Sequence, residues 1–252
     1  MEKITIEQFD AVYIAKLMLD KLDIVYDVKN ENNLLLAKSS ELIEVIDSIE
    51  KIENNWELGV DSKEHTFGRK ELNEIIKLWS VPKKSAEVLE NLVILTGAKN
   101  VLEVGTSAGY STLHLANGAM KNSGRVYTIE LLQEKIDLAK SNFEKSGLQN
   151  ITLLEAEASK ILSNWNFGEI DFVFLDADKE NYGKYLDLLL PKMKIGAIIV
   201  ADNINDYGHM MEDYLQRITG THLPKSKVDR RVRNYYLASL DNGLMITKKI
   251  AE

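Results

Sequence analysis

The chain has 252 residues, a formal net charge of −8 and a pI near 5.2. Such an acidic chain lacks the broad basic surface of a general nucleic-acid binder, so we expect no nucleic-acid partner. The absence of cysteine excludes disulfides, thiol catalysis and cysteine-ligated zinc. No basic segment leading into an apolar run opens the chain, and no apolar stretch approaches membrane-spanning length. We therefore expect a cytoplasmic protein without a membrane partner.

Residues 1–75 have apolar side chains at helical spacing and few glycines or prolines. The pattern predicts helices over residues 6–19 and 39–50 and a loop over residues 59–68. We interpret residues 1–75 as a helical extension that serves as a lid or an oligomerisation element. The remaining residues, 76–252, form the main predicted domain.

From Ser80 onward, apolar strands alternate with amphipathic helices. The predicted strands cover residues 100–104, 125–129, 151–154, 171–175, 196–201 and 244–248. The predicted helices cover residues 85–95, 110–120, 132–146, 180–190 and 207–218. This alternation is typical of an α/β fold with a doubly wound, parallel sheet.

The strongest functional signal is a glycine-containing turn between the first of these strands and its helix. The strand runs into Gly105-Thr-Ser-Ala-Gly109, and the helix opens at Tyr110. A turn of this kind exposes backbone N–H groups and the positive end of a helix dipole, which favours a nucleotide-like ligand. The middle glycine of the dinucleotide fingerprint G-x-G-x-x-G is absent, which argues against an NAD-dependent oxidoreductase.

Two acidic residues near this turn favour S-adenosylmethionine as the ligand. Glu103 lies in the strand, two residues before Gly105, where a carboxylate would repel a diphosphate and attract the amino group of that cofactor. Glu130 ends the next strand, about 20 residues after the turn, where an acid holds a ribose diol. Taken alone, Glu130 would be a solvated strand end, but its spacing from the turn favours the ribose role.

A second group of polar side chains follows two later strands. Asp176 comes directly after one of them, and Asp202 and Asn203 come after the next. Because the carboxyl ends of parallel strands meet at one edge, we expect these oxygens to converge beside the glycine turn. Two carboxylates and an amide oxygen suit Mg²⁺, with Mn²⁺ or Ca²⁺ as alternatives. The competing interpretation is that both aspartates only cap the helices that follow them.

Together with Lys179, these motifs resemble those of the metal-dependent class I S-adenosylmethionine O-methyltransferases, which include caffeoyl-CoA and catechol O-methyltransferases. The resemblance is carried by Leu-Glu-Val-Gly-Thr-Ser-Ala-Gly-Tyr-Ser, Leu-Asp-Ala-Asp-Lys-Glu-Asn-Tyr and Ala-Asp-Asn, and it runs from about Val81 to the C-terminus. It implies the Rossmann-like methyltransferase fold, a mostly parallel sheet of seven strands, for residues 76–252. It also implies a homodimer.

The resemblance assigns a role to each matching residue. Contacts to S-adenosylmethionine fall to Val81, Glu103, Gly105, Thr106, Ser111, Glu130, Ala158 and Asp176. Within that set, Glu103 and Ser111 match contacts to the methionine part, Glu130 to the ribose and Ala158 to the adenine. The metal ligands match Asp176, Asp202 and Asn203. Lys179 matches the general base of the catechol-type enzymes, with Asp176 as the second catalytic residue.

The implied reaction moves a methyl group to a hydroxyl of a small catechol-like or hydroxycinnamoyl-type acceptor. The segment after Asn203 departs from the family, since it enters a helix where the family often has a tryptophan- and glycine-containing loop. Residues 225–233 form the one basic run, which supports a tRNA hydroxyuridine O-methyltransferase as an alternative. A non-catalytic, cofactor-binding assembly subunit is the alternative from another functional class.

Overall fold

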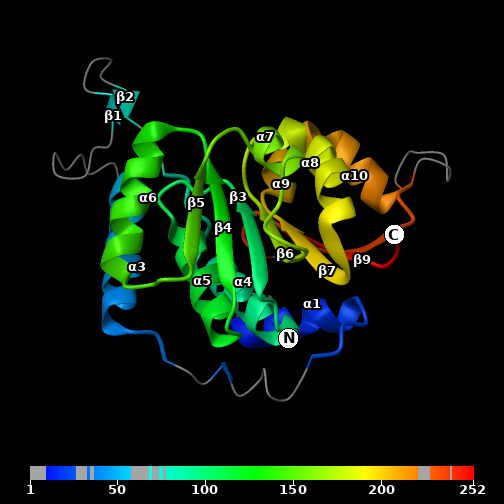
Figure 1. Ribbon diagram of the computed structural model, residues 1–252, viewed down its shortest axis with the longest axis horizontal. Helices are drawn as coiled ribbons and strands as arrows, with labels where there is room; N and C mark the ends of the chain where they lie inside the picture. The colour runs from blue at the N-terminus through cyan, green and yellow to red at the C-terminus, as the bar shows by residue number, and fades with distance from the viewer. Residues whose placement is uncertain are drawn as a thin grey trace, which may run out of the picture.

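A sheet of seven strands forms the centre of the structure, in the order β5-β4-β3-β6-β7-β9-β8 (Figure 1). The computed structural model describes residues 10–26, 33–34, 37–57, 68–69, 74–75, 78–220, 228–238 and 240–252. The strands of this sheet are β3 (Asn100–Val104), β4 (Arg125–Glu130), β5 (Ile151–Glu155), β6 (Ile170–Leu175), β7 (Met193–Ala201), β8 (Val232–Leu237) and β9 (Leu244–Lys249). Strands β3 to β7 are parallel, whereas β9 runs antiparallel to both β7 and β8. The predicted seven-stranded, mostly parallel sheet is confirmed.

The order of the strands places a topological switch point between β3 and β6. From β3 the chain moves outward through β4 and β5, then returns to the other side of β3 to form β6 and β7. In doubly wound sheets, ligands bind beyond the carboxyl ends of the strands at such a point. The site is therefore expected beyond Val104 and Leu175, the last residues of β3 and β6.

Helices cover both faces of the sheet, so its central strands are apolar on both sides. Neighbouring strand residues such as Val101 and Leu102 are both buried but belong to two different hydrophobic clusters. One cluster includes side chains of α1 (Ala11–Lys21), α3 (Ser40–Glu57), α4 (Lys83–Thr96) and α5 (Tyr110–Lys121). The other includes side chains of α7 (Ala158–Ser163), α8 (Tyr182–Leu189) and α10 (Glu212–Thr219), which lie together in Figure 1. The remaining long helix, α6 (Gln133–Ser146), contacts α3.

The N-terminal helices pack into the first of these two cores. Ile14 and Met18 of α1, and Leu42 and Ile49 of α3, are buried in the same cluster as α4 and α5. Two short strands, β1 (Gly68–Arg69) and β2 (Glu74–Ile75), pair antiparallel, and neither was predicted from the sequence. The predicted loop over residues 59–68 lies almost wholly outside the described residues.

Several predicted elements differ in detail from the observed ones. Strand β8 was not predicted, because its polar and apolar residues are mixed and its first two residues belong to the basic run. The helix predicted over residues 207–218 consists of three pieces, α9 (Ile204–Tyr207), a 3₁₀ turn η4 (Gly208–Met211) and α10. The helix predicted over residues 180–190 likewise begins with a 3₁₀ turn, η2 (Lys179–Asn181), and η3 (Leu190–Lys192) follows it. Within the described ranges, no helix combines the length and the apolar character needed to cross a bilayer.

Candidate active site

The glycine turn after β3 lies against the end of β6. Gly105 has a φ of 104°, and a Cβ added to it would lie 2.1 Å from the carbonyl oxygen of Asp176. Gly109 has a φ of 87°, and its added Cβ would lie 2.4 Å from the ring of Phe143 in α6. Both positions therefore require glycine, for conformation and for space. Because Gly105 approaches Asp176 so closely, the turn predicted to bind the cofactor is adjacent to the aspartate predicted to bind the metal.

The carboxylate of Glu103 is fully buried under the turn and is held by hydroxyl groups. Ser111 Oγ and Thr128 Oγ1 each donate to it at 2.6 Å, and the hydroxyl of Thr112 donates as well. Burial raises the pKa of Glu103 to about 7 against the lowering effect of these hydroxyls, and the charge of Asp176 adds to the rise. The structure thus brings Glu103 and Ser111 together. Thr128 was missed from the sequence, although it stands opposite Glu103 in the register of β3 and β4.

The carboxylate of Glu130 is fixed at the end of β4 by backbone donors. Its Oε2 accepts from the N–H of Ser107 at 2.9 Å, and its Oε1 accepts from Leu131 at 2.8 Å and from Leu132 at 3.0 Å. Ser107 belongs to the glycine turn, so Glu130 and the turn are directly linked. Thr106 also faces β4, since its backbone N–H donates to the Ile129 carbonyl at 3.2 Å.

Asp176 and Lys179 form an ion pair at the end of β6. Lys179 Nζ lies 2.5 Å from Asp176 Oδ1 and 3.2 Å from the hydroxyl of Tyr182. Tyr182 is fully buried and donates in turn to the Leu175 carbonyl at 2.9 Å, which fixes the position of its hydroxyl. Burial raises the pKa of Tyr182 well above its ordinary value, so its hydroxyl stays protonated. The neutral hydroxyl of Tyr182 therefore helps to hold Lys179 beside Asp176.

Asp202 lies next to Asp176, because the preceding residues Leu175 and Ala201 are partners across β6 and β7. Its side chain is almost completely buried, and its Oδ1 has no hydrogen-bond donor among the described residues. Its Oδ2 accepts a bond of 3.3 Å from the side-chain amide of Asn203. Burial raises the pKa of Asp202, and the carboxylate of Asp176 raises it further.

These features fit a divalent cation. An unpaired, buried carboxylate oxygen next to a second carboxylate is costly unless a cation compensates the charge. The described part of the chain contains no cluster of three histidine, aspartate or glutamate side chains suited to a metal. The candidate set is instead two carboxylates and one amide, from Asp176, Asp202 and Asn203.

The helix-cap interpretation of the aspartates is wrong for Asp202. Helix α9 begins after Asn203, which adopts a left-handed conformation with a φ of 63°, and no side chain caps this helix. Asp178 likewise makes no cap bond. It accepts instead from Tyr185 at 2.5 Å and from the amide of Asn181.

The other predicted residues lie around this edge of the sheet. Val81 is buried directly before α4, and Ala158 is the first residue of α7. The segment containing Val81 reaches the glycine turn, because Ser107 Oγ donates to the Leu78 carbonyl. Lys135, at the start of α6, was not singled out from the sequence.

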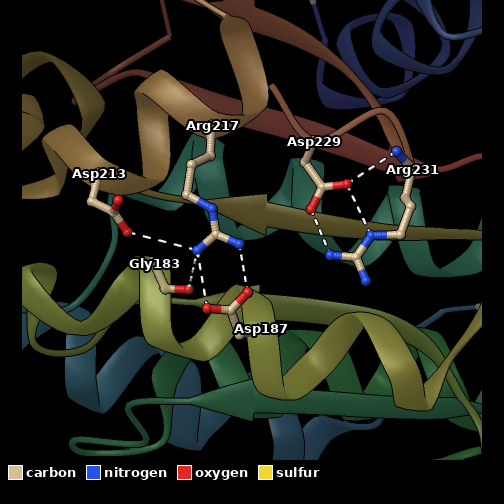
Figure 2. Close-up of polar contacts among 6 residues, drawn as sticks. All are labelled: Gly183, Asp187, Asp213, Arg217, Asp229 and Arg231. Carbon is tan, nitrogen blue, oxygen red and sulfur yellow. Dashed lines mark hydrogen bonds and ion pairs between the residues drawn. The ribbon is translucent and has the colours of Figure 1, made fainter. Parts of the chain in front are cut away.

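Two arginines of the predicted basic run pair with acidic side chains. Arg231 pairs with Asp229 at 2.6 Å (Figure 2), and Arg233 pairs with Asp23 at 3.1 Å. Figure 2 also shows Arg217 of α10 joined to Asp187 and the Gly183 carbonyl of α8, and to Asp213. Residues 225–227 of the run lie outside the described residues. The paired arginines offer little free charge to a nucleic-acid phosphate backbone.

Comparison with protein families matches residues 63–250 to a model described as O-methyltransferase. Among curated relatives, tricin synthase 2 of Oryza sativa subsp. japonica is 36% identical over 153 residues, covering 58% of this chain and 49% of the relative. Catechol O-methyltransferase of Niastella koreensis is 35% identical over 138 residues, covering 53% of this chain and 62% of the relative. The matched part is about half the length of the first of these relatives.

Solved structures share the fold at lower sequence identity. An O-methyltransferase from Bacillus cereus, solved in complex with SAH, has a TM-score of 0.62 at 24% identity and covers 85% of this chain and 93% of its own. An O-methyltransferase of tomaymycin synthesis from Streptomyces achromogenes, solved in complex with SAM, has a TM-score of 0.65 at 19% identity. The alignment covers 100% of both chains. At these identities, the likeness establishes the fold alone.

Proposed function

The chain belongs to the O-methyltransferase family, and on this premise we propose that it transfers a methyl group from S-adenosylmethionine to a hydroxyl oxygen of a small acceptor. We propose a catechol-like or hydroxycinnamoyl-type acceptor, because vicinal oxygens suit a site that also holds a divalent cation. The observation that carries the proposal is the contact between the Gly105 turn and Asp176, which joins the cofactor turn to the Asp176–Lys179 pair. The named relatives, a catechol O-methyltransferase among them, support the same class of reaction.

The cofactor would lie along the glycine turn, between the ends of β3 and β4. Glu130 is preorganised to accept from the ribose hydroxyls, because three backbone N–H groups fix its carboxylate. The backbone of Gly105 and Thr106, with Glu103 and Ser111 beneath it, would face the methionine part. Val81 and Ala158 would contribute from the two flanking segments, Ala158 on the adenine side.

A divalent cation, Mg²⁺ in the first instance, would be held by Asp176, Asp202 and Asn203. The support is the buried Oδ1 of Asp202, which has no donor among the described residues, beside a second carboxylate. When bound, the sulfonium of the cofactor supplies an electrophilic methyl group, and the cation supplies a Lewis acid that favours ionisation of a hydroxyl.

The residues of the chain then have separate tasks in the transfer. Lys179, in its neutral amine form, would accept the proton of the acceptor hydroxyl at Nζ, which lies at the site beside Asp176. Tyr182 and Asp176 hold Nζ in place, which limits the orientations that the base samples.

We also propose that the chain acts as a cytoplasmic homodimer and that residues 1–75 form a lid or a dimer contact. The support for the lid is the bond of 2.7 Å from Tyr110, at the start of α5, to Glu50 of α3. This bond links the extension to the helix that begins at the glycine turn. Light scattering in solution tests the dimer, and a monomeric mass would contradict it.

The proposed function is tested by following label from methyl-labelled S-adenosylmethionine. The purified chain is incubated with vicinal diphenols, hydroxycinnamoyl thioesters or tRNA, each with Mg²⁺ and with EDTA. We expect transfer to a diphenol or thioester that EDTA abolishes. Transfer to tRNA alone would favour the RNA-modifying alternative. Binding of the cofactor without transfer to any acceptor would favour the assembly-subunit alternative.

A further inference from the structure

Lys135 is a buried cation in a position where the helix pattern calls for an uncharged residue. The inward-facing residues of α6 include Lys135, Ala139, Asn142 and Ser146, which follow one stripe of the helix. Lys135 is only 8% exposed, although lysine is rarely buried without a partner. The placement of α6 is fixed, because the Asn142 amide donates to the Ala108 carbonyl in the glycine turn at 2.8 Å. Lys135 therefore lies at the end of the stripe closest to the carboxyl edge of the sheet.

The surroundings of the Lys135 ammonium are aromatic and acidic. Its Nζ lies 5.2 Å from the centroid of the Trp79 ring, a cation–π contact. Within the described residues, Nζ has neither a hydrogen-bond acceptor nor a carboxylate at ion-pair distance. Burial lowers the pKa of Lys135, whereas carboxylates oppose this, Glu130 most strongly, followed by Asp176 and Glu53. The ammonium therefore has N–H groups available to donate. Among the carboxylates, Glu130 has the strongest electrostatic interaction with it.

Glu130 is only partly available to a ligand. A carboxylate has about four acceptor positions, and backbone N–H groups of Ser107, Leu131 and Leu132 take three of them. A ribose diol has two hydroxyl groups, so Glu130 alone leaves part of the diol without a protein partner. A nearby hydrogen-bond donor would give the ribose hydroxyl oxygens a protein partner as well.

We propose that Lys135 is a further cofactor-binding residue, whose ammonium donates to the ribose hydroxyls that Glu130 accepts from. The inference rests on the proposed function, since it takes an adenosyl ribose as the ligand at Glu130. It explains why a lysine occupies a buried position of α6 beside the Trp79 ring. The ribose end is favoured over the sulfonium end, because a cation beside a sulfonium would weaken binding of the charged cofactor.

The test is the affinity of the full chain for S-adenosylhomocysteine, measured by calorimetry. Lys135→Met keeps the length and the apolar stem of the side chain but removes the donor. We expect binding to weaken about tenfold or more, as for loss of a charged hydrogen bond. The matched control is Lys140→Met on the same helix, where the lysine is half exposed and pairs with Glu155. This control should bind like the wild type.

A second ligand identifies the atoms involved. For the analogue that lacks both ribose hydroxyls, wild type and Lys135→Met should bind equally, because the groups that Lys135 contacts are gone. Equal binding of S-adenosylhomocysteine by wild type and Lys135→Met would overturn the inference, as would the same loss for both ligands. If Lys135→Met does not fold, Lys135→Leu, which also lacks a donor, is measured in its place, with the same expectation. A wild type that fails to bind S-adenosylhomocysteine would instead overturn the proposed function.

Discussion

At the residue scale, the site combines side chains that are each stabilised by a neighbour at the same edge of the sheet. Lys179 is held by Asp176 and Tyr182, Glu103 by hydroxyl groups, and Glu130 by backbone N–H groups. Asp202 is the exception, with one oxygen lacking a donor among the described residues. The exception marks where a cation would bind.

The first prediction concerns the proposed general base. Lys179→Met should lower kcat by about 10²- to 10⁴-fold, since it removes the proton acceptor. Affinity for S-adenosylhomocysteine should change little, because the role proposed for Lys179 is proton transfer from the acceptor and not cofactor binding. Lys184→Met is the control, an exposed lysine of α8. Wild-type kcat in the Lys179 variant, measured by steady-state kinetics, would refute its role as the base.

The second prediction concerns pH and Glu103. Its pKa is about 7 in the folded chain against an ordinary value of 4.5, so the folded state binds the extra proton. This contribution to stability is complete below the ordinary pKa and is lost as the pH rises through about 7. Between pH 8 and pH 6 it should add roughly 1 kcal/mol to the free energy of unfolding.

Glu103→Gln should remove that gain in the free energy of unfolding. The difference between wild type and the variant then reports Glu103 alone, because other titrating groups such as Asp202 contribute to both chains. Urea unfolding at the two pH values measures it, with exposed Glu144→Gln as the control. If wild type and Glu103→Gln gain the same stability between pH 8 and pH 6, then Glu103 has no raised pKa.

At the element scale, the turn after β3 packs against the end of β6. This contact brings the proposed cofactor turn next to the proposed metal ligand Asp176. Gly105→Ala should destabilise the chain severely, because its Cβ would overlap the Asp176 carbonyl and its φ is positive. Gly147→Ala, at the end of α6, is the matched control. It also has a positive φ, but its Cβ would meet no atom within 4 Å, so we expect a cost of only about 1 kcal/mol. Thermal unfolding compares the two, and equal losses would contradict the close contact.

Most of the sheet could be predicted from the sequence, because β3, β6 and residues 197–201 of β7 are mostly apolar and mostly buried. Strand β8 could not, because it is an edge strand with a mixed pattern that begins at the end of a basic run. The break between α9 and α10 at Gly208 was also missed, because the apolar spacing continues across it.

The position of a candidate residue was predictable where it ends or follows a strand, as Glu130, Asp176 and Asp202 do, because the sheet topology then fixes its place. Lys135, Tyr182 and Thr128 could not be recognised in this way. Their roles depend on which side chains meet in three dimensions, such as Lys135 with the ring of Trp79. Knowledge of the strand register would have identified Thr128, which stands opposite Glu103.

At the scale of the whole molecule, the N-terminal helices are part of the main core. Ile14 and Leu42 are buried against it, and Lys38 pairs with the buried Glu90 of α4 at 2.8 Å. The division between residues 75 and 76 stays a prediction. A truncated chain that begins at residue 76 would expose the apolar surface of α4 that α1 covers.

We therefore expect the truncated chain to unfold at a markedly lower temperature than the full chain, or to aggregate. Circular dichroism during heating and light scattering measure the two outcomes. A truncated chain that melts at the temperature of the full chain would show that the extension is an independent appendage.

The central claim is that the ends of β3, β4, β6 and β7 form one site for a sulfonium cofactor and a divalent cation. A crystal structure with S-adenosylhomocysteine and Mg²⁺ tests it most directly. We predict the ribose at Glu130, the homocysteine along Gly105, and the ion on Asp176, Asp202 and Asn203. Density for the ligand or the ion away from this edge of the sheet would contradict the account.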